Sequence, residues 1–137
     1  MKPTTDHFKR MAAGEDYAGD HLLVEFWGAC NLTDPGAIRE ALESSARAAG
    51  ATLLHSHYHS FGDGGVSGVS VLAESHITIH TWPARGYAAI DIFMCGGCDP
   101  VDCLPELKHR LSPRRIEHQT IRRGRCRPPA GTAQDVA

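Results

Sequence analysis

The chain has 137 residues with a formal net charge of −2, and its 42% hydrophobic and 22% charged residues are typical of a globular protein. Its length suits one domain and is too short for two ordinary ones. The charge gives no basis for binding nucleic acid or an anionic membrane, no apolar run approaches the roughly 20 residues of a membrane-spanning helix, and the N-terminus lacks the apolar segment of a secretory signal. We therefore expect a cytoplasmic protein.

The first elements follow a polar N-terminal stretch. Residues 1–17 predict a flexible leader, and DHLLVEFWG (20–28) is rich in β-formers and predicts a strand. A helix follows, with Asp34 as N-cap, Pro35 at its first position and Gly50 as its stop. Its apolar stripe consists of Ile38, Ala41, Leu42, Ala46 and Ala49.

The middle of the chain is rich in Val, Ile, Thr and aromatic residues. An extended segment at 51–61 leads into a turn, GDGG (62–65). Further strands are predicted at 66–73, 75–82, 86–94 and 114–121. Strands that follow one another directly, with few helices between them, favour an antiparallel sheet.

A second helix should begin near Asp99 and Pro100, and Pro105 should delay or shorten it. Residues 123–137 have little to bury and predict a disordered tail. We therefore expect one α+β domain over residues 18–122, a two-layer sandwich with helices on one face of an antiparallel sheet.

Reactive side chains concentrate in the strand-rich stretch: Ser67, Glu74, Ser75, His76, His80 and Cys95. Side chains on a strand alternate between faces, so a regular strand would point Ser75 and His80 in opposite directions. A chain break or kink at Glu74–Ser75 is one way to bring them together. Taken singly, a serine or a histidine here would be an ordinary strand residue. A Ser–His–acid hydrolase is disfavoured because no G-x-S-x-G motif surrounds Ser75.

Two groups of residues raise the question of a metal. Cys95 and Cys98 form a CxxC with Cys103 close behind, but a structural zinc site usually needs a second pair at a distance. His55, His57 and His59 alternate along a strand and share one face. We predict no metal, and keep a small metal-binding module as a rival hypothesis. Stoichiometric zinc in the purified protein would favour that rival.

The run GVSGVSVLAESHITIHTWPARGYAAIDIFMCG (65–96) resembles the core of the prokaryotic S-adenosylmethionine decarboxylase proenzymes. The stretch HLLVEFWGACN (21–31) and the histidine-rich strand that ends at Phe61 fit the same family, so the resemblance covers about residues 18–125. It implies a two-layer α+β sandwich, a small-molecule substrate, and homodimers of processed protomers whose pockets draw on both subunits.

The resemblance also implies self-cleavage of the Glu74–Ser75 bond. The Ser75 hydroxyl attacks the preceding carbonyl, the amide becomes an ester, and β-elimination followed by hydrolysis leaves a pyruvoyl group on residue 75. That group is the cofactor, and it forms a Schiff base with the substrate amine. His80 matches the histidine that removes the serine α-proton. Ser67 matches a serine that assists cleavage.

Three more positions match the family's substrate site. Cys95 matches the cysteine that returns a proton to the substrate after CO2 leaves. Phe61 matches a ring that stacks on adenine. Glu25 lies in the matching N-terminal strand and is a weaker pocket candidate. Read alone, Cys95 would be a small buried side chain and Phe61 a packing residue.

One position departs from the family pattern. Members that use S-adenosylmethionine usually have glutamate directly after TWP, where it binds the ribose hydroxyls; here the residue is Ala84. A same-family decarboxylase acting on L-ornithine or L-arginine is therefore the alternative. A non-catalytic homologue is a further rival, although it would be expected to lose Ser75, His80 or Cys95, and all three are present.

Overall fold

The computed structural model describes residues 7–12 and 14–127 of the chain. The main elements, in chain order, are β3 (Gly19–Trp27), α1 (Pro35–Ala48), β4 (Leu53–Ser60), β5 (Val66–Leu72), β6 (Ser75–Trp82), β7 (Tyr87–Cys95), α2 (Leu104–Leu111) and β8 (Arg115–Arg123). The six predicted long strands and the first predicted helix are all confirmed, with small shifts in their bounds.

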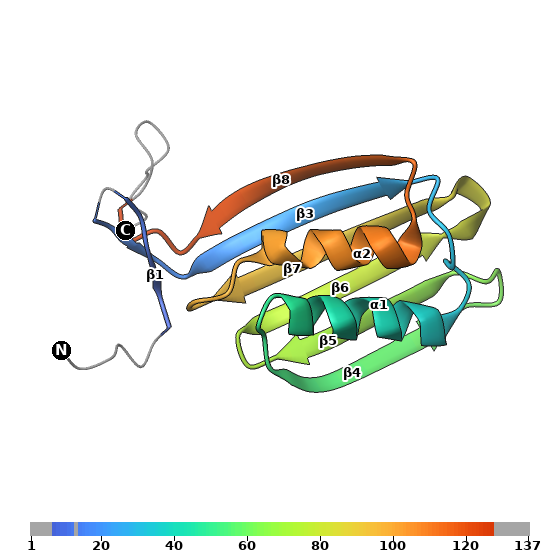
Figure 1. Cartoon of the computed structure of the whole chain (residues 1–137), viewed down its shortest axis with the longest axis horizontal. Coiled ribbons are helices and arrows are strands. Elements are labelled where there is room, and N and C mark those ends of the chain that lie inside the picture. The colour runs from blue at the N-terminus through green and yellow to red at the C-terminus, as the bar shows by residue number, and fades with distance from the viewer. Residues whose placement is uncertain (1–6, 13, 128–137) are drawn as a thin grey trace, which may run out of the picture.

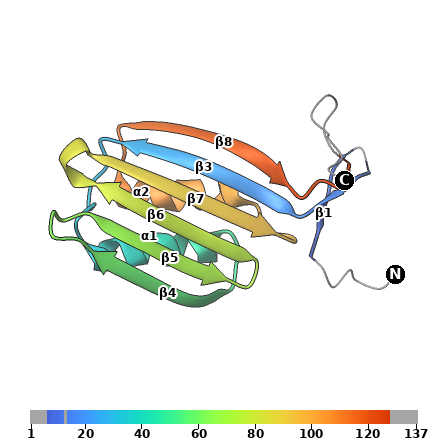
Figure 2. The ribbon, with the colours of Figure 1, turned by 180° about the vertical axis from the view of Figure 1, so that it is seen from behind.

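The six long strands form one sheet in the order β4-β5-β6-β7-β3-β8, and every neighbouring pair is antiparallel. Both helices lie on the same face of this sheet (Figure 1). Seen from behind, the opposite face carries no helix in the described part of the chain (Figure 2). The predicted α+β sandwich is therefore confirmed, and we call the uncovered side the helix-free face.

Strand β7 shows how the two faces differ. Its buried side chains belong to the core between sheet and helices: Ala88, Ile90, Ile92 and Met94. Because side chains alternate along a strand, the intervening residues lie on the helix-free face. They are half-buried, and the last of them is Cys95.

Helix α1 forms as its sequence predicts. The Asp34 carboxylate accepts hydrogen bonds from the N–H groups of Gly36 and Ala37, so the cap satisfies two otherwise unpaired donors. The buried face contains the predicted stripe from Ile38 to Ala46 together with one polar residue, Ser45, whereas the predicted Ala49 is the C-cap and is partly buried. The Ser45 hydroxyl donates to the Ala41 carbonyl one turn earlier, so it is buried without an unpaired donor.

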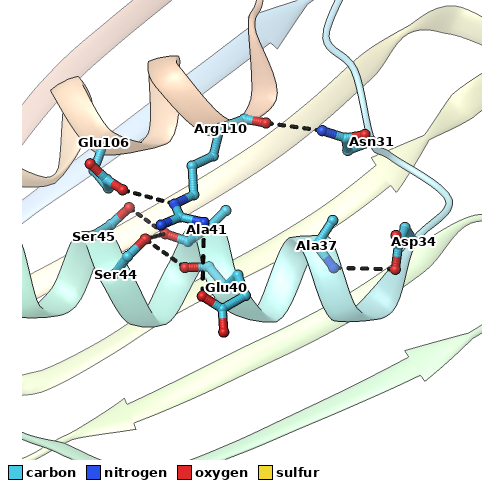
Figure 3. Close-up of polar contacts among 9 residues, drawn as sticks. All are labelled: Asn31, Asp34, Ala37, Glu40, Ala41, Ser44, Ser45, Glu106 and Arg110. Carbon is cyan, nitrogen blue, oxygen red and sulfur yellow. Dashed lines mark hydrogen bonds and ion pairs between the residues drawn. The ribbon is translucent and has the colours of Figure 1, made fainter.

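The two helices are joined by a polar cluster around Arg110 of α2 (Figure 3). Its guanidinium donates to Glu106 at 2.8 Å on the same helix and lies 3.8 Å from Glu40 of α1. The Arg110 carbonyl accepts from Asn31 at 3.1 Å. These contacts tie the helix layer together at its outer surface.

Helix α2 begins later than its first cap because of two prolines. The Asp99 carboxylate caps a short 3-10 helix, η2 (Pro100–Cys103), and α2 follows with Pro105 in its first turn. Pro105 has no N–H to donate, which costs nothing in the first turn of a helix. The predicted delay is confirmed. Among the described residues, no helix is long and apolar enough to cross a membrane.

The first and last described segments of the chain lie at the same end of the sheet (Figure 1). Within the predicted leader, β1 (Lys9–Arg10) and β2 (Asp16–Tyr17) form a two-stranded sheet, and the Tyr17 side chain is buried. Within the predicted tail, the Cys126 N–H donates to the Asp16 carbonyl at 3.1 Å. Residues 1–6, 13 and 128–137 lie outside the described part of the chain.

Candidate active site

The Glu74–Ser75 bond lies at the end of the tight turn that joins β5 to β6. Leu72 pairs with Ser75, so Ala73 and Glu74 form a two-residue loop. Such loops favour turns with positive φ at their central residues. Neither loop residue here has a positive φ, and the positive φ of +143° falls on Ser75 instead.

This backbone angle makes Ser75 a strained residue. Few residues other than glycine adopt positive φ, and holding one there costs about 1–3 kcal/mol. Such strain persists only where the surroundings enforce it. Ser75 is held because the rest of β6 is paired along its length with β5 and β7. The strained residue is therefore the one that directly follows the Glu74–Ser75 peptide bond.

The carbonyl of that peptide bond is hydrogen-bonded. The N–H of Cys95, at the end of β7, donates to the Glu74 carbonyl oxygen at 3.0 Å. A donor fixed in this position can stabilise negative charge on the oxygen if the carbonyl is attacked. The same contact places the half-buried Cys95 residue beside Ser75.

The Glu74 side chain points elsewhere. Its carboxylate accepts from the Thr52 N–H at 2.8 Å and from the Thr52 hydroxyl at 3.3 Å. The Ala73 N–H also donates to the Thr52 carbonyl, at 2.9 Å. Thr52 was not singled out in the sequence, yet it anchors the turn. No local pattern could have revealed it, because it lies 22 residues away from Glu74.

Ser67 and His80 form a second polar pair. They face each other across β5 and β6, and the Ser67 hydroxyl lies 2.8 Å from His80 Nδ1. His80 lies five positions after Ser75 along a regular strand, or about 16 Å away at 3.3 Å per residue. The structure therefore does not bring His80 to Ser75 within one protomer, and no kink at Glu74–Ser75 closes the gap.

Phe61 lies at the same end of the sheet as the Ser67–His80 pair. It is half-exposed, and His59 meets its ring edge-on at a centroid distance of 4.6 Å. Beside it is a hollow of about 260 Å³ lined by His57, His59, Ser67, Gly68, Val69, Thr78 and His80. An aromatic ring next to an open hollow is a suitable place for a flat ligand.

Glu25 belongs to an aromatic cluster on the helix-free face, away from Cys95. It pairs with Ala89, whereas Cys95 pairs with Gly19 at the other end of β3. The Tyr87 hydroxyl donates to Glu25 at 2.5 Å, and the Tyr87 ring stacks on Trp27 and Trp82. Burial, followed by the Glu25 carboxylate, raises the pKa of Tyr87 to about 12. The sequence analysis named Glu25 as a pocket candidate but did not predict this cluster.

A second group lies beside Ser75 and Cys95, and of its members the sequence analysis named only His76. The rings of His21 and His76 both lie against Phe93, at centroid distances of 5.6 and 6.0 Å. Burial lowers the pKa of His76, and the nearby His21 lowers it further. An uncharged imidazole at neutral pH is therefore favoured next to Ser75.

No group of three or more metal-ligating side chains converges among the described residues. His55, His57 and His59 are exposed, and they alternate along β4 on one face, as predicted. Cys98 and Cys103 are buried in the core.

Comparisons with known proteins bear on this site. Residues 20–124 match the family described as S-adenosylmethionine decarboxylase. An S-adenosylmethionine decarboxylase proenzyme of Methanococcus maripaludis strain C7 is 46% identical over 109 residues, which cover 77% of this chain and 89% of that protein. A proenzyme of the same name from Thermomicrobium roseum is 41% identical over 108 residues, covering 77% and 93%. The crystal structure of the Aquifex aeolicus adenosylmethionine decarboxylase superposes with a TM-score of 0.70 at 34% identity, over 86% of this chain and 98% of that one.

Proposed function

The chain belongs to the S-adenosylmethionine decarboxylase family, so it is a carboxy-lyase made as a proenzyme, and we propose that it cleaves itself between Glu74 and Ser75. Its reaction removes CO2 from S-adenosylmethionine and serves polyamine biosynthesis. The relatives compared above carry the S-adenosylmethionine name, and none of them supports the L-ornithine or L-arginine alternative.

The observation that carries the cleavage proposal is the geometry of the Glu74–Ser75 peptide unit. Its carbonyl accepts the Cys95 N–H, and Ser75 holds the strained φ of +143°. Attack by the Ser75 hydroxyl on the Glu74 carbonyl carbon forms an oxyanion that the Cys95 N–H stabilises. Breaking the C–N bond then gives an ester and relieves the constraint on residue 75. Strain in the reactant and stabilisation of the transition state both favour this step.

The next step needs a base at the Ser75 α-carbon. Removing the α-proton expels Glu74 as a carboxylate, and water converts the remaining dehydroalanine to a pyruvoyl group and ammonia. His80 suits the role chemically because imidazole is the side chain that most often serves as a general base. A general base must lie within hydrogen-bonding reach of its proton, and the His80 of the same protomer is about 16 Å away along β6.

We propose that the Ser67–His80 pair comes from a second copy of the chain. The two halves of the site lie at opposite ends of the β5–β6 hairpin, and Ser67 and His80 are on the helix-free face. In a twofold dimer both subunits use the same surface, so if residue i of one subunit contacts residue j of its partner, residue j of the first also contacts residue i of the partner. Two helix-free faces packed together can therefore bring the Ser75 end of each protomer to the His80 end of the other.

The exposed apolar side chains of this face support such a dimer. Trp82 and Val71 remain 47% and 38% exposed, and Phe61 is 50% exposed at the rim. Aromatic side chains of this kind are enriched in the cores of protein interfaces. Burying them between two sheets would also create a closed pocket at each end.

The residues around Ser75 fit the pyruvoyl cofactor that the family implies. A pyruvoyl group supplies an electron sink for decarboxylation. We propose that the Cys95 thiol, half-buried beside residue 75, returns a proton to the substrate carbon. We propose that Phe61 of the partner subunit stacks on the adenine, and we retain Glu25 only as a residue that orients Tyr87.

Intact-mass analysis tests the cleavage site. The purified chain should appear as two fragments of 74 and 63 residues (137 − 74 = 63), the second without a free N-terminal amine. Ser75→Ala should stay whole, while Ser44→Ala, which removes a half-buried hydroxyl on α1, should cleave normally. A wild-type chain that releases CO2 from S-adenosylmethionine without being cut would refute the proposal. Parallel assays with L-ornithine and L-arginine test the substrate.

A further inference from the structure

The two cysteines of the CxxC motif flank a glycine turn at the end of β7. Cys95 is the last residue of the strand, and Gly96 and Gly97 form the turn that leads to Cys98. The corner residues of a four-residue turn lie within about 7 Å of each other, measured between Cα atoms. Disulfides span Cα distances of about 4.4–6.8 Å. The turn therefore brings the Cα atoms of Cys95 and Cys98 to a separation that a disulfide bond can span.

The N-terminal segment holds this turn in place at two points. The Gly96 N–H donates to the His7 carbonyl at 2.7 Å, and the Lys9 ammonium donates to the Cys98 carbonyl. Gly97, between these points, is exposed, and a Cβ added there would meet no atom within 4 Å. The ends of the turn are anchored, while its middle is free to adjust as a bond forms.

The cysteine thiols differ in their environments. Cys95 is half-buried on the helix-free face, whereas Cys98 is 8% exposed and packs against the core. Burial raises the pKa of the Cys98 thiol, and the Glu74 carboxylate raises it further, whereas Lys9 lowers it. Cys103 is fully buried, and burial raises its pKa to about 12. Cys95 is therefore the thiol of this group that a dissolved oxidant meets first.

We infer that Cys98 is a resolving cysteine for Cys95, so that hydroperoxides convert the pair into a disulfide and reversibly stop the enzyme. The Cys95 sulfur first takes one oxygen from the hydroperoxide, which leaves as an alcohol or water, and becomes a sulfenic acid. The Cys98 sulfur then attacks the Cys95 sulfur, and water leaves as the disulfide forms. Two electrons pass from the two thiols to the O–O bond.

This bond would have two consequences at the site. The disulfide removes the thiol hydrogen that we propose protonates the substrate, so turnover stops; this effect rests on the proposed function. It also keeps Cys95 from oxidation to sulfinic or sulfonic acid, which thiols do not reverse. A dithiol reductant would restore both thiols by exchange.

Mass spectrometry after brief hydrogen peroxide treatment tests the bond directly. The fragment that contains residues 75–137 should become about 2 Da lighter, and peptide mapping should recover Cys95 linked to Cys98. CO2 release should fall in step with the mass change and return with dithiothreitol. Cys98→Ala should give no such bond and should lose activity irreversibly. Cys30→Ser, which removes an exposed cysteine outside the motif, should behave like the wild type.

Two results would overturn the inference. One is a wild-type protein whose Cys95 goes directly to sulfinic acid under mild peroxide. The other is a disulfide that joins Cys98 to Cys103 and leaves Cys95 reduced. Both can be read in the unmutated protein, so a Cys98 variant that fails to fold does not affect the test. The bond can also be measured in an uncut chain, so a failure of the proposed self-cleavage would be seen separately.

Discussion

Two variants that are each unable to mature should restore cleavage when they are produced together. Ser75→Ala lacks the nucleophile, and His80→Ala lacks the proposed base. Within one protomer these residues are about 16 Å apart along β6, whereas proton transfer needs contact at about 3 Å. If His80 acts across the dimer, a mixed dimer has one site with both Ser75 and His80 and one site with neither.

The expected yield follows from random pairing. With equal amounts of the two chains, about half of the His80→Ala chains have a Ser75→Ala partner and should be cut. The Ser75→Ala chains should never be cut. Different affinity tags on the two chains allow the mixed dimers to be isolated, and intact masses identify which chain has been cleaved.

A matched control replaces the helper chain with the double variant Ser75→Ala/His80→Ala. Its mixed dimers lack His80 altogether and should remain whole. The reasoning is refuted if isolated mixed dimers of the two single variants stay uncut, or if His80→Ala alone matures at the wild-type rate.

Three further predictions follow from individual contacts. Cys95→Ala should still be cleaved, because only its main-chain N–H contacts the Glu74 carbonyl, but CO2 release should fall by about two orders of magnitude. Burial, followed by the Glu25 carboxylate, raises the pKa of Tyr87 from 10.0 to about 12. The stability that the Tyr87 proton contributes is therefore complete below pH 10.0 and is lost as the pH rises toward about 12. Urea unfolding between these pH values should show a falling free energy of unfolding in the wild type and a smaller fall in Tyr87→Phe. Ala84→Glu should restore a ribose contact and lower the KM for S-adenosylmethionine about tenfold, or ~1.4 kcal/mol; an unchanged or higher KM would contradict that role.

Local signals in the sequence were sufficient for the elements that depend on near neighbours. Asp34 and Pro35 fix the start of α1 because capping involves only the next three residues. Pro105 delays α2 for an equally local reason. The residues of 86–94 predicted a strand, and the structure confirms it as β7.

Contacts between distant segments could not be read in this way. The alternation of β6 says that Ser75 and His80 differ in face, but not which other strands lie beside them. The Cys95 N–H reaches Glu74 only because β7 pairs with β6 in one particular register. Thr52 and Tyr87 were missed for the same reason, since their partners lie 22 and 62 residues away.

The sheet order explains why the fold can survive being cut at Ser75. The first product would contain β3, β4 and β5, and the second would contain β6, β7 and β8. Because β3 lies between β7 and β8, and β5 pairs with β6, the two products share three strand interfaces. Helices α1 and α2, one from each product, also pack together through Arg110. Separating the products would break the middle of the sheet. The hydrogen bonds of β6 with β5 and β7, which hold Ser75 in its strained conformation before cleavage, would also hold the new chain end at the site after cleavage.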